Sequence, residues 1–322
     1  MRMPRLILVL PLIGIFLVSC TGAERMRSLA DSEPIAKSSS TIPSSTSKRE
    51  EFTVSNVPGI RSAEILFVVD NSISMLDEID AVKTRIEEFF GFLTGQSVNF
   101  SLRITTTDPN FSGQFITTNS GVSLVKSTDA EAANTVKEML GLIKQGSSNE
   151  MGIKNAKAAA EKMDVLSVLS IIVFSDEQDV SPEPVSAYVN DFNTLQTEKN
   201  IKYAFFPFIK TAQSSCSLGS YESYGTRYLE LANAFAQNGS RTYDLCQVES
   251  TFPEVAFQIS RLSACFTLAT SATKILNVTL NGNALASSMH SLKPDKLTLC
   301  LSGDLDLGDG SHVVVDYEIP AQ

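Results

Sequence analysis

Apolar residues along this chain fall into alternating strand-like and helix-like patterns. Ile65–Val69 is a continuous apolar run, typical of a strand buried on both faces, and Val165–Phe174 repeats the pattern. The remaining periodicity predicts helices at 75–93, 130–143, 151–163, 184–198, 224–237 and 252–262, and strands at 98–107, 122–126, 201–209 and 241–245. This alternation predicts an α/β fold with a doubly wound, mostly parallel sheet flanked by helices, spanning residues 51–264.

The two ends of the chain have a different texture. Residues 20–50 are rich in Ser and Thr and hold few apolar groups, which predicts a flexible tether. Phe52–Val54 is expected to begin an edge strand that precedes the main domain. Beyond residue 264, short strands separated by hairpin-type turns predict a small antiparallel β unit at 265–322. Its expected strands are Ile275–Leu280, Lys296–Leu301 and His312–Ile319.

The first residues indicate export. Arg2 and Arg5 precede the apolar run Leu6–Val18, which is too short to span a bilayer as a stable helix but suits a signal peptide. The tetrapeptide Leu-Val-Ser-Cys, ending at Cys20, resembles the lipobox of bacterial lipoproteins. The resemblance implies a signal peptide at 1–19, lipid attachment to Cys20 and a location in the cell envelope. The residue after the cysteine is Thr21 rather than Asp, which in a Gram-negative cell resembles an outer-membrane lipoprotein. A plain signal peptide that contains a cysteine is the alternative.

Composition and cysteine content narrow the function classes. Hydrophobic residues make up 43% of the chain and charged residues 19%, enough for a sizeable core, and the net charge of -10 argues against nucleic acid as a partner. In an oxidising compartment, the even set of remaining cysteines predicts disulfides. We expect Cys216–Cys246 and Cys265–Cys300, since each pair stays within one structural unit, although the sequence also permits the other pairings.

Polar oxygens gather where two apolar strands end. Asp70 directly follows the first strand, with Ser72 and Ser74 in the next turn, and Asp176 follows the second strand. Neighbouring strands at a topological switch point would bring both acids into one crevice. Ser148 precedes a predicted helix and offers another hydroxyl. Hard cations such as Mg²⁺, and also Mn²⁺ or Ca²⁺, take oxygen ligands, so these residues predict a metal site.

At these positions the chain resembles the von Willebrand factor A (VWA) domain with its metal-ion-dependent adhesion site (MIDAS). That pattern is Asp-x-Ser-x-Ser after the first strand, a Thr in a later loop and an Asp after the fourth strand. The resemblance covers about residues 63–264. It implies direct coordination of the ion by Ser72, Ser74 and Ser148, with Asp70 and Asp176 acting through water. A carboxylate from an Asp or Glu of a protein partner would then fill the open position.

The chain departs from that pattern in two places. Ser148 stands where the family has Thr, and Ser147 is an alternative register for the same position. Glu177 follows Asp176 where many relatives have Gly, and with Asp179 it makes the rim more acidic. Taken singly, Asp108 and Asp179 are expected to be ordinary solvated loop charges.

Purely structural roles for the same residues compete with the metal site. Ser74 to Asp77 also fits a capping box, in which Ser74 caps the following helix. Asp70 also fits a turn acid satisfied by backbone donors. Catalysis has little support, because His290 and His312 lie far from the acids in sequence and no general base is evident. The leading hypothesis is therefore protein recognition through a metal ion, and the alternative is an envelope scaffold whose metal site is stabilising or internally occupied.

Overall fold

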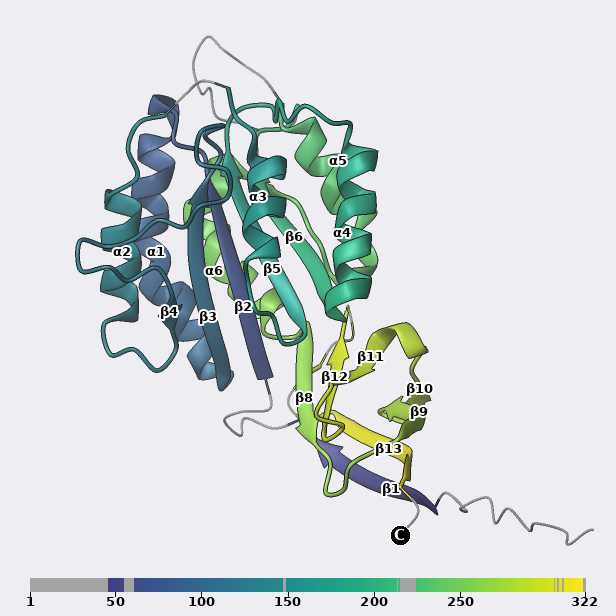
Figure 1. Ribbon diagram of the computed structural model, residues 1–322. Coiled ribbons are helices and arrows are strands. Elements are labelled where there is room, and N and C mark those ends of the chain that lie inside the picture. Colours follow the sequence, from purple (N-terminus) through teal and green to yellow (C-terminus); the bar gives the residue numbers. More distant parts are fainter. Residues whose placement is uncertain are drawn as a thin grey trace, which may run out of the picture. The chain divides into compact units, whose positions relative to one another are not determined.

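The computed structural model describes residues 46–54, 61–146, 149–212, 214, 224–303, 305, 307–308 and 310–320. In this part of the chain a sheet has the strand order β4-β3-β2-β5-β6-β7 (Figure 1). All neighbours pair in parallel except β4, which runs antiparallel to β3. The strands are β2 (Arg61–Val69), β3 (Val98–Thr106), β4 (Val125–Lys126), β5 (Val168–Ser175), β6 (Lys202–Ile209) and β7 (Tyr243–Asp244). The predicted α/β fold with a mostly parallel sheet is confirmed.

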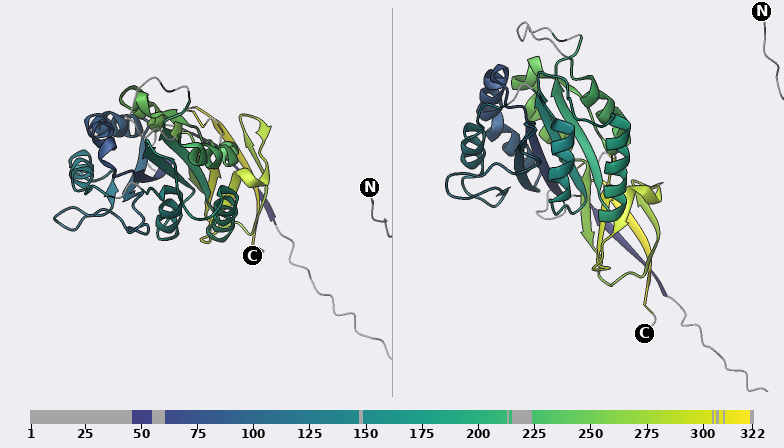
Figure 2. Two further views of the ribbon diagram at one scale, coloured as in Figure 1. Left: turned by 90° about the horizontal axis from the view of Figure 1, so that it is seen from above. Right: turned by 45° about the horizontal axis from the view of Figure 1, so that its top comes forward.

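Helices cover both faces of this sheet (Figure 2). Helices α1, α2 and α6 pack into one hydrophobic cluster with the strands, and α3, α4 and α5 pack into another on the opposite face. The helices are α1 (Leu76–Gly95), α2 (Ala132–Gly141), α3 (Gly152–Glu161), α4 (Val185–Lys199), α5 (Thr226–Ala234) and α6 (Val248–Ile259). Short 3-10 turns occur at η1 (Ile73–Met75), η2 (Ala236–Asn238), η3 (Leu245–Gln247) and η4 (Ser287–Met289).

The central strands read as continuous apolar runs because helices cover both of their faces. Every residue of β5 is buried. On the α1/α6 face, Phe252 of α6 stacks on Phe89 of α1 with ring centroids 4.6 Å apart, and it meets Phe67 of β2 and Phe174 of β5 edge to face. Val69 pairs with Phe174 in the sheet register. This packing holds the carboxyl ends of β2 and β5 side by side at the switch point of the topology.

The remaining strands build the β unit, which contains two antiparallel sheets in the orders β1-β13-β9-β10 and β11-β12-β8. Its strands are β1 (Thr46–Thr53), β8 (Ser263–Thr267), β9 (Lys274–Leu280), β10 (Asn283–Ala284), β11 (His290–Leu292), β12 (Thr298–Ser302) and β13 (His312–Ile319). The predicted small antiparallel unit is thus confirmed. The sequence pattern did not predict β8, β10 or β11.

Strand β1 corrects two predictions about the start of the folded part. Residues 46–50 were expected in the tether, and residues 51–54 with the α/β domain. Instead β1 pairs along its whole length with β13, from Thr46 opposite Ile319 to Thr53 opposite His312. This pairing supplies hydrogen-bond partners to the backbone of β13, and Phe52 packs on Phe266 of β8 with ring centroids 4.9 Å apart. The β unit therefore combines both ends of the folded chain.

Cysteine positions agree with a cross-linked β unit. Cys265 of β8 lies directly opposite Cys300 of β12, and the two form a disulfide with their Cα atoms 4.0 Å apart. Cys246 is also disulfide-bonded, while Cys216, its expected partner, lies outside the described residues. Cys20 and the expected signal peptide lie outside them as well. In the described segments, no helix is both long and apolar enough to cross a membrane.

Candidate metal site at the switch point of the sheet

Asp70 lies at the carboxyl end of β2, in the crevice beside β5. Its backbone N–H donates to the carbonyl of Phe174 at 2.9 Å. Its fully buried carboxylate accepts hydrogen bonds from the backbone N–H of Ser72 at 2.8 Å and from the hydroxyl of Ser175 at 2.6 Å. Burial raises the pKa of Asp70 to about 6, and the nearby carboxylate of Asp176 adds to the increase. Asp70 thus has the donors of a turn acid and also faces a second acid.

The hydroxyls of Ser72 and Ser74 converge on one point. Their Oγ atoms are 3.0 Å apart, with Ser72 buried and Ser74 exposed. The alternative in which Ser74 caps α1 is wrong: Met75 is the N-cap residue of α1, and no side chain caps that end. Ser72 is the N-cap residue of η1 and Ser74 lies within it, so a single 3-10 turn holds both hydroxyls within hydrogen-bond distance of each other. Neither hydroxyl is therefore needed to cap the N-terminus of α1.

Asp176 directly follows β5 and faces the serine hydroxyls. It is buried, and its Oδ1 atom has no hydrogen-bond partner among the described residues. Burial raises the pKa of the Asp176 carboxyl, and hydrogen bonding from the Ser74 hydroxyl opposes that increase. The structure therefore brings together Asp70, Ser72, Ser74 and Asp176, as the strand-end pattern predicted. Their role as metal ligands stays a prediction.

The predicted third loop reaches the same place, although Ser148 and its alternative Ser147 lie outside the described residues. Just before them, the backbone N–H of Gly146 donates to the carbonyl of Asn71 at 2.9 Å, and Asn71 Nδ2 donates to the carbonyl of Lys144 at 2.8 Å. A Cβ atom at Gly146 would lie 2.2 Å from Asn71 Nδ2. A side chain at position 146 would therefore require either Asn71 to move or the two loops to separate.

Sequence reasoning missed Glu150, a buried acid in the same loop. Its Oε2 atom accepts a hydrogen bond from the hydroxyl of Thr107, and its Oε1 atom is buried without a hydrogen-bond partner in the described part of the chain. Burial raises the pKa of Glu150 to about 8, and the charge of Asp70 is the next cause. The only local signal was an acid beside the predicted Ser148 ligand. Its burial depends on contacts with distant segments.

The acids after Asp176 differ from each other. Glu177 is partly buried, and burial raises its pKa to about 7, with Asp70 and Asp176 adding to the increase. The expectation of a solvated charge at Asp179 is wrong. Its carboxylate is buried and forms an ion pair with Arg227 at 3.0 Å. Asp179 therefore lies behind the crevice, while Glu177 belongs to its rim.

A divalent cation fits the chemistry of this arrangement. Burial raises the pKa of Asp70, Asp176 and Glu150, because little water reaches these carboxyl groups to stabilise their charged forms, and a bound cation would offset that cost. In the described segments, no three His, Cys, Asp or Glu side chains are grouped so that they alone could hold a metal ion. A cation here would therefore depend on hydroxyl ligands as well, and Ser72 and Ser74 provide them.

Comparisons with known proteins yielded structural neighbours only. No protein-family model matches the chain, and no curated protein matches it. Solved structures with similar arrangements include a von Willebrand factor type A protein from Catenulispora acidiphila, with 13% identity, a TM-score of 0.43, and coverage of 88% of this chain and 67% of that one. The pilus adhesin SpaC from Lactobacillus rhamnosus GG has 13% identity and a TM-score of 0.42, and the match covers 84% of this chain and 40% of the adhesin.

A further structural neighbour is proximal thread matrix protein 1 from the mussel byssus, described with a zinc-occupied MIDAS motif. It has 12% identity and a TM-score of 0.39, and the match covers 66% of this chain and 48% of that protein. The chain thus spans less than half the length of the adhesin and of the byssus protein.

Proposed function

We propose that this chain is a cell-envelope lipoprotein that binds a protein partner through one divalent metal ion, in the manner of a MIDAS. Ser72, Ser74 and Ser148 would hold the ion directly, and Asp70 and Asp176 would hold it through water. Mg²⁺ is the expected ion, with Mn²⁺ or Ca²⁺ as alternatives. When bound, the ion supplies an open coordination position for an anionic oxygen.

One observation carries this proposal. At the switch point of the sheet, the carboxylates of Asp70 and Asp176 meet at two adjacent strand ends, and the hydroxyls of Ser72 and Ser74 lie 3.0 Å apart between them. Ligands bind at such switch points in open α/β sheets. Neutral hydroxyls in direct contact with a cation leave it more of its charge for an incoming carboxylate.

The surface around the site supports a protein partner rather than a small solute. Ile73, between the two serines, is 64% exposed, and Leu76 at the start of α1 is 57% exposed. Val180, four residues after Asp176, is 46% exposed. Apolar side chains beside a desolvated polar centre are typical of the core of a protein interface. A partner's Asp or Glu flanked by apolar residues would match this surface.

Metal binding is tested first on the purified full-length protein by calorimetric titration with Mg²⁺ and Mn²⁺. Asp176→Ala should abolish binding, whereas Asp80→Ala should not, because Asp80 is an exposed acid of α1 whose carboxylate pairs with Lys83 at 3.0 Å. Partner capture from an envelope extract should then need both the metal and Asp176. Capture that persists in excess chelator would show that the ion does not bridge the partner.

The alternative is an envelope scaffold whose metal stabilises the fold or is satisfied internally. Asp70 favours this alternative, since both of its oxygens already accept hydrogen bonds within the chain. A scaffold would show a metal-dependent rise in melting temperature while retaining no partner on a column. Lipid attachment is tested separately by labelling cells with a fatty-acid analogue. The label should appear on the wild-type chain and be absent from Cys20→Ala.

A further inference from the structure

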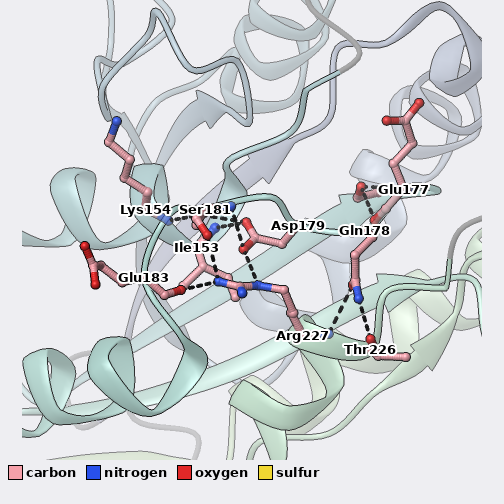
Figure 3. Close-up of polar contacts among 10 residues, drawn as sticks. Ile153, Lys154, Glu177, Gln178, Asp179, Ser181, Glu183, Thr226 and Arg227 are labelled. Atoms are coloured by element: carbon pink, nitrogen blue, oxygen red, sulfur yellow. Dashed lines mark hydrogen bonds and ion pairs between the residues drawn. The ribbon is translucent and has the colours of Figure 1, made fainter.

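Asp179 joins the loop after β5 to the beginning of α3 (Figure 3). Its Oδ1 atom accepts the backbone N–H of Ile153 at 3.0 Å and the hydroxyl of Ser181 at 2.8 Å. Ser181 Oγ in turn accepts the backbone N–H of Lys154 at 3.1 Å. The first amides of a helix lack partners within it, so these bonds cap α3 from a loop far away in sequence.

These contacts connect two of the loops that build the candidate metal site. Asp176 begins the loop that carries Asp179, and Ser148 and Glu150 immediately precede α3. The backbone N–H of Val180 also donates to the carbonyl of Glu150 at 2.7 Å. The separation between Asp176 and residues 149–150 is therefore set largely by the bonds from Asp179 and its neighbours to the start of α3.

Arg227, near the start of α5, holds this connection from behind. Its Nε atom donates to Asp179 Oδ2 at 3.0 Å, and its Nη2 atom donates to the carbonyls of Ser181, at 3.0 Å, and Glu183. Its backbone N–H donates to Oε1 of Gln178 at 3.2 Å. The planar guanidinium can make several such bonds at once, and it compensates a carboxylate that is buried.

We propose that Arg227 is a positioning residue of the metal site: through Asp179 it fixes the distance between Asp176 and the segment 149–150 that precedes α3. The inference rests on the proposed function, because it assigns Arg227 a part in the same site. No atom of Arg227 is required to contact the ion or the partner. Residues that orient metal ligands from outside the coordination shell typically change metal affinity by about 10–100-fold when they are replaced.

The main experiment measures Mn²⁺ affinity of the full-length protein by calorimetry, at a temperature where every variant is folded. Arg227→Gln and Asp179→Asn should each weaken binding about 10–100-fold. The Mn²⁺ affinity of the double variant should lie within about twofold of the affinity of the more impaired single variant. The reason is that both substitutions break the same connection. Asp179→Asn keeps the volume of the side chain and an acceptor for Ile153, so it serves if Arg227→Gln does not fold. The proposal would be overturned if the losses of Mn²⁺ binding free energy in the two single variants added fully in the double variant. It would also be overturned if both single variants bound Mn²⁺ as tightly as the wild type.

The matched control lies at the other end of α3. Lys199 of α4 donates to the carbonyls of Ala160 and Met163 at 2.9 and 3.1 Å. Lys199→Gln removes these bonds from the far end of the same helix. Its Mn²⁺ affinity should stay within about twofold of wild type even if the protein loses stability. An equal loss of affinity in this control would mean that loosening α3 anywhere weakens the site, and Arg227 would have no special part.

Hydrogen exchange without metal separates this inference from the proposed function. In Arg227→Gln, amides of residues 149–156 and 176–184 should both exchange faster than in wild type, while Lys199→Gln should leave them protected. If wild-type protein binds no Mn²⁺, the proposed function fails, and exchange still decides whether Arg227 joins the two loops. Unchanged protection in both segments would overturn the inference.

Discussion

Gly146→Ala tests whether the close contact between two loops holds the candidate site together. The backbone of Gly146 is not in the left-handed region, so alanine is compatible with its conformation and the cost is one of contact. The added Cβ would lie 2.2 Å from Asn71 Nδ2 and 2.5 Å from its Cγ. Either the Asn71 side chain must move or the loops must separate. Moving it breaks its 2.8 Å hydrogen bond to the carbonyl of Lys144.

The expected cost follows from those contacts. Leaving a buried hydrogen bond unmade costs about 1–3 kcal/mol. Replacing glycine by alanine returns about 0.4–1 kcal/mol, because the unfolded chain loses conformational freedom. The net destabilisation of Gly146→Ala should therefore lie between about 0 and 2.5 kcal/mol. Mn²⁺ binding should weaken, because the contact between the loops of Asn71 and Gly146 is disturbed.

Urea unfolding of Gly146→Ala, Asn71→Ala and the double variant measures the effect as a coupling. In the double variant the clashing side chain is absent, so alanine at 146 should cost little beyond Asn71→Ala alone. A coupling energy of about 1 kcal/mol or more is expected between these neighbours. Costs that simply add would show that the two residues do not press on one another, and the reasoning about loop approach would be wrong.

The other predictions concern stability away from the loops. Glu64→Gln should stabilise the protein by about 2 kcal/mol more at about pH 8 than at about pH 5. The reason is that burial raises the pKa of Glu64 from 4.5 to about 7, so the stability of the wild type falls as pH rises between those values. An equal effect of the substitution in urea unfolding at both pH values would contradict this. Replacing Cys265 and Cys300 together by Ala should cost up to about 4 kcal/mol, given a sequence separation of 35, and leave Mn²⁺ affinity unchanged; a loss of metal binding would contradict a local role. Phe252→Ala should cost about 3–5 kcal/mol in thermal unfolding, and Phe92→Ala, at an exposed position, under about 1 kcal/mol; similar costs would contradict the assigned core.

The sequence predicts best what depends on local burial. Strands β2 and β5 are covered on both faces, so their apolar runs are continuous and their ends are marked by Asp70 and Asp176. Strand β1 could not be found in this way. Its residues are charged or polar except Phe52, with four charged residues in a row, and its partner β13 lies at the other end of the chain. Nothing within β1 itself indicates which edge it will join.

The same reasoning separates the site residues that were predicted from those that were missed. Asp70, Ser72 and Ser74 follow one another in a single turn, so their spacing is visible in the sequence. Asp179 has a local signal, because the backbone N–H of Ser181 donates to its carboxylate. The partner of its charge is Arg227, 48 residues further along the chain. A pattern within one loop cannot reveal a contact made by the packing of α5 against another loop.

The surplus of acids at the site changes what a metal ion would do there. Glu150 and Glu177 place two more carboxyl groups beside Asp70. Burial raises their pKa to about 8 and about 7, and the charge of Asp70 adds to both increases, so above these pH values the metal-free crevice carries further negative charge. On the proposed function, a partner carboxylate approaching the metal-free crevice would meet repulsion as well as missing coordination. A bound cation would reverse the local potential besides offering a ligand position. On this reasoning, partner affinity would differ more between the metal-free and metal-bound states than it would with Ser72 and Ser74 alone. Glu177→Gln should therefore raise the amount of partner that is captured in excess chelator. The ratio of capture with metal to capture without metal should fall accordingly.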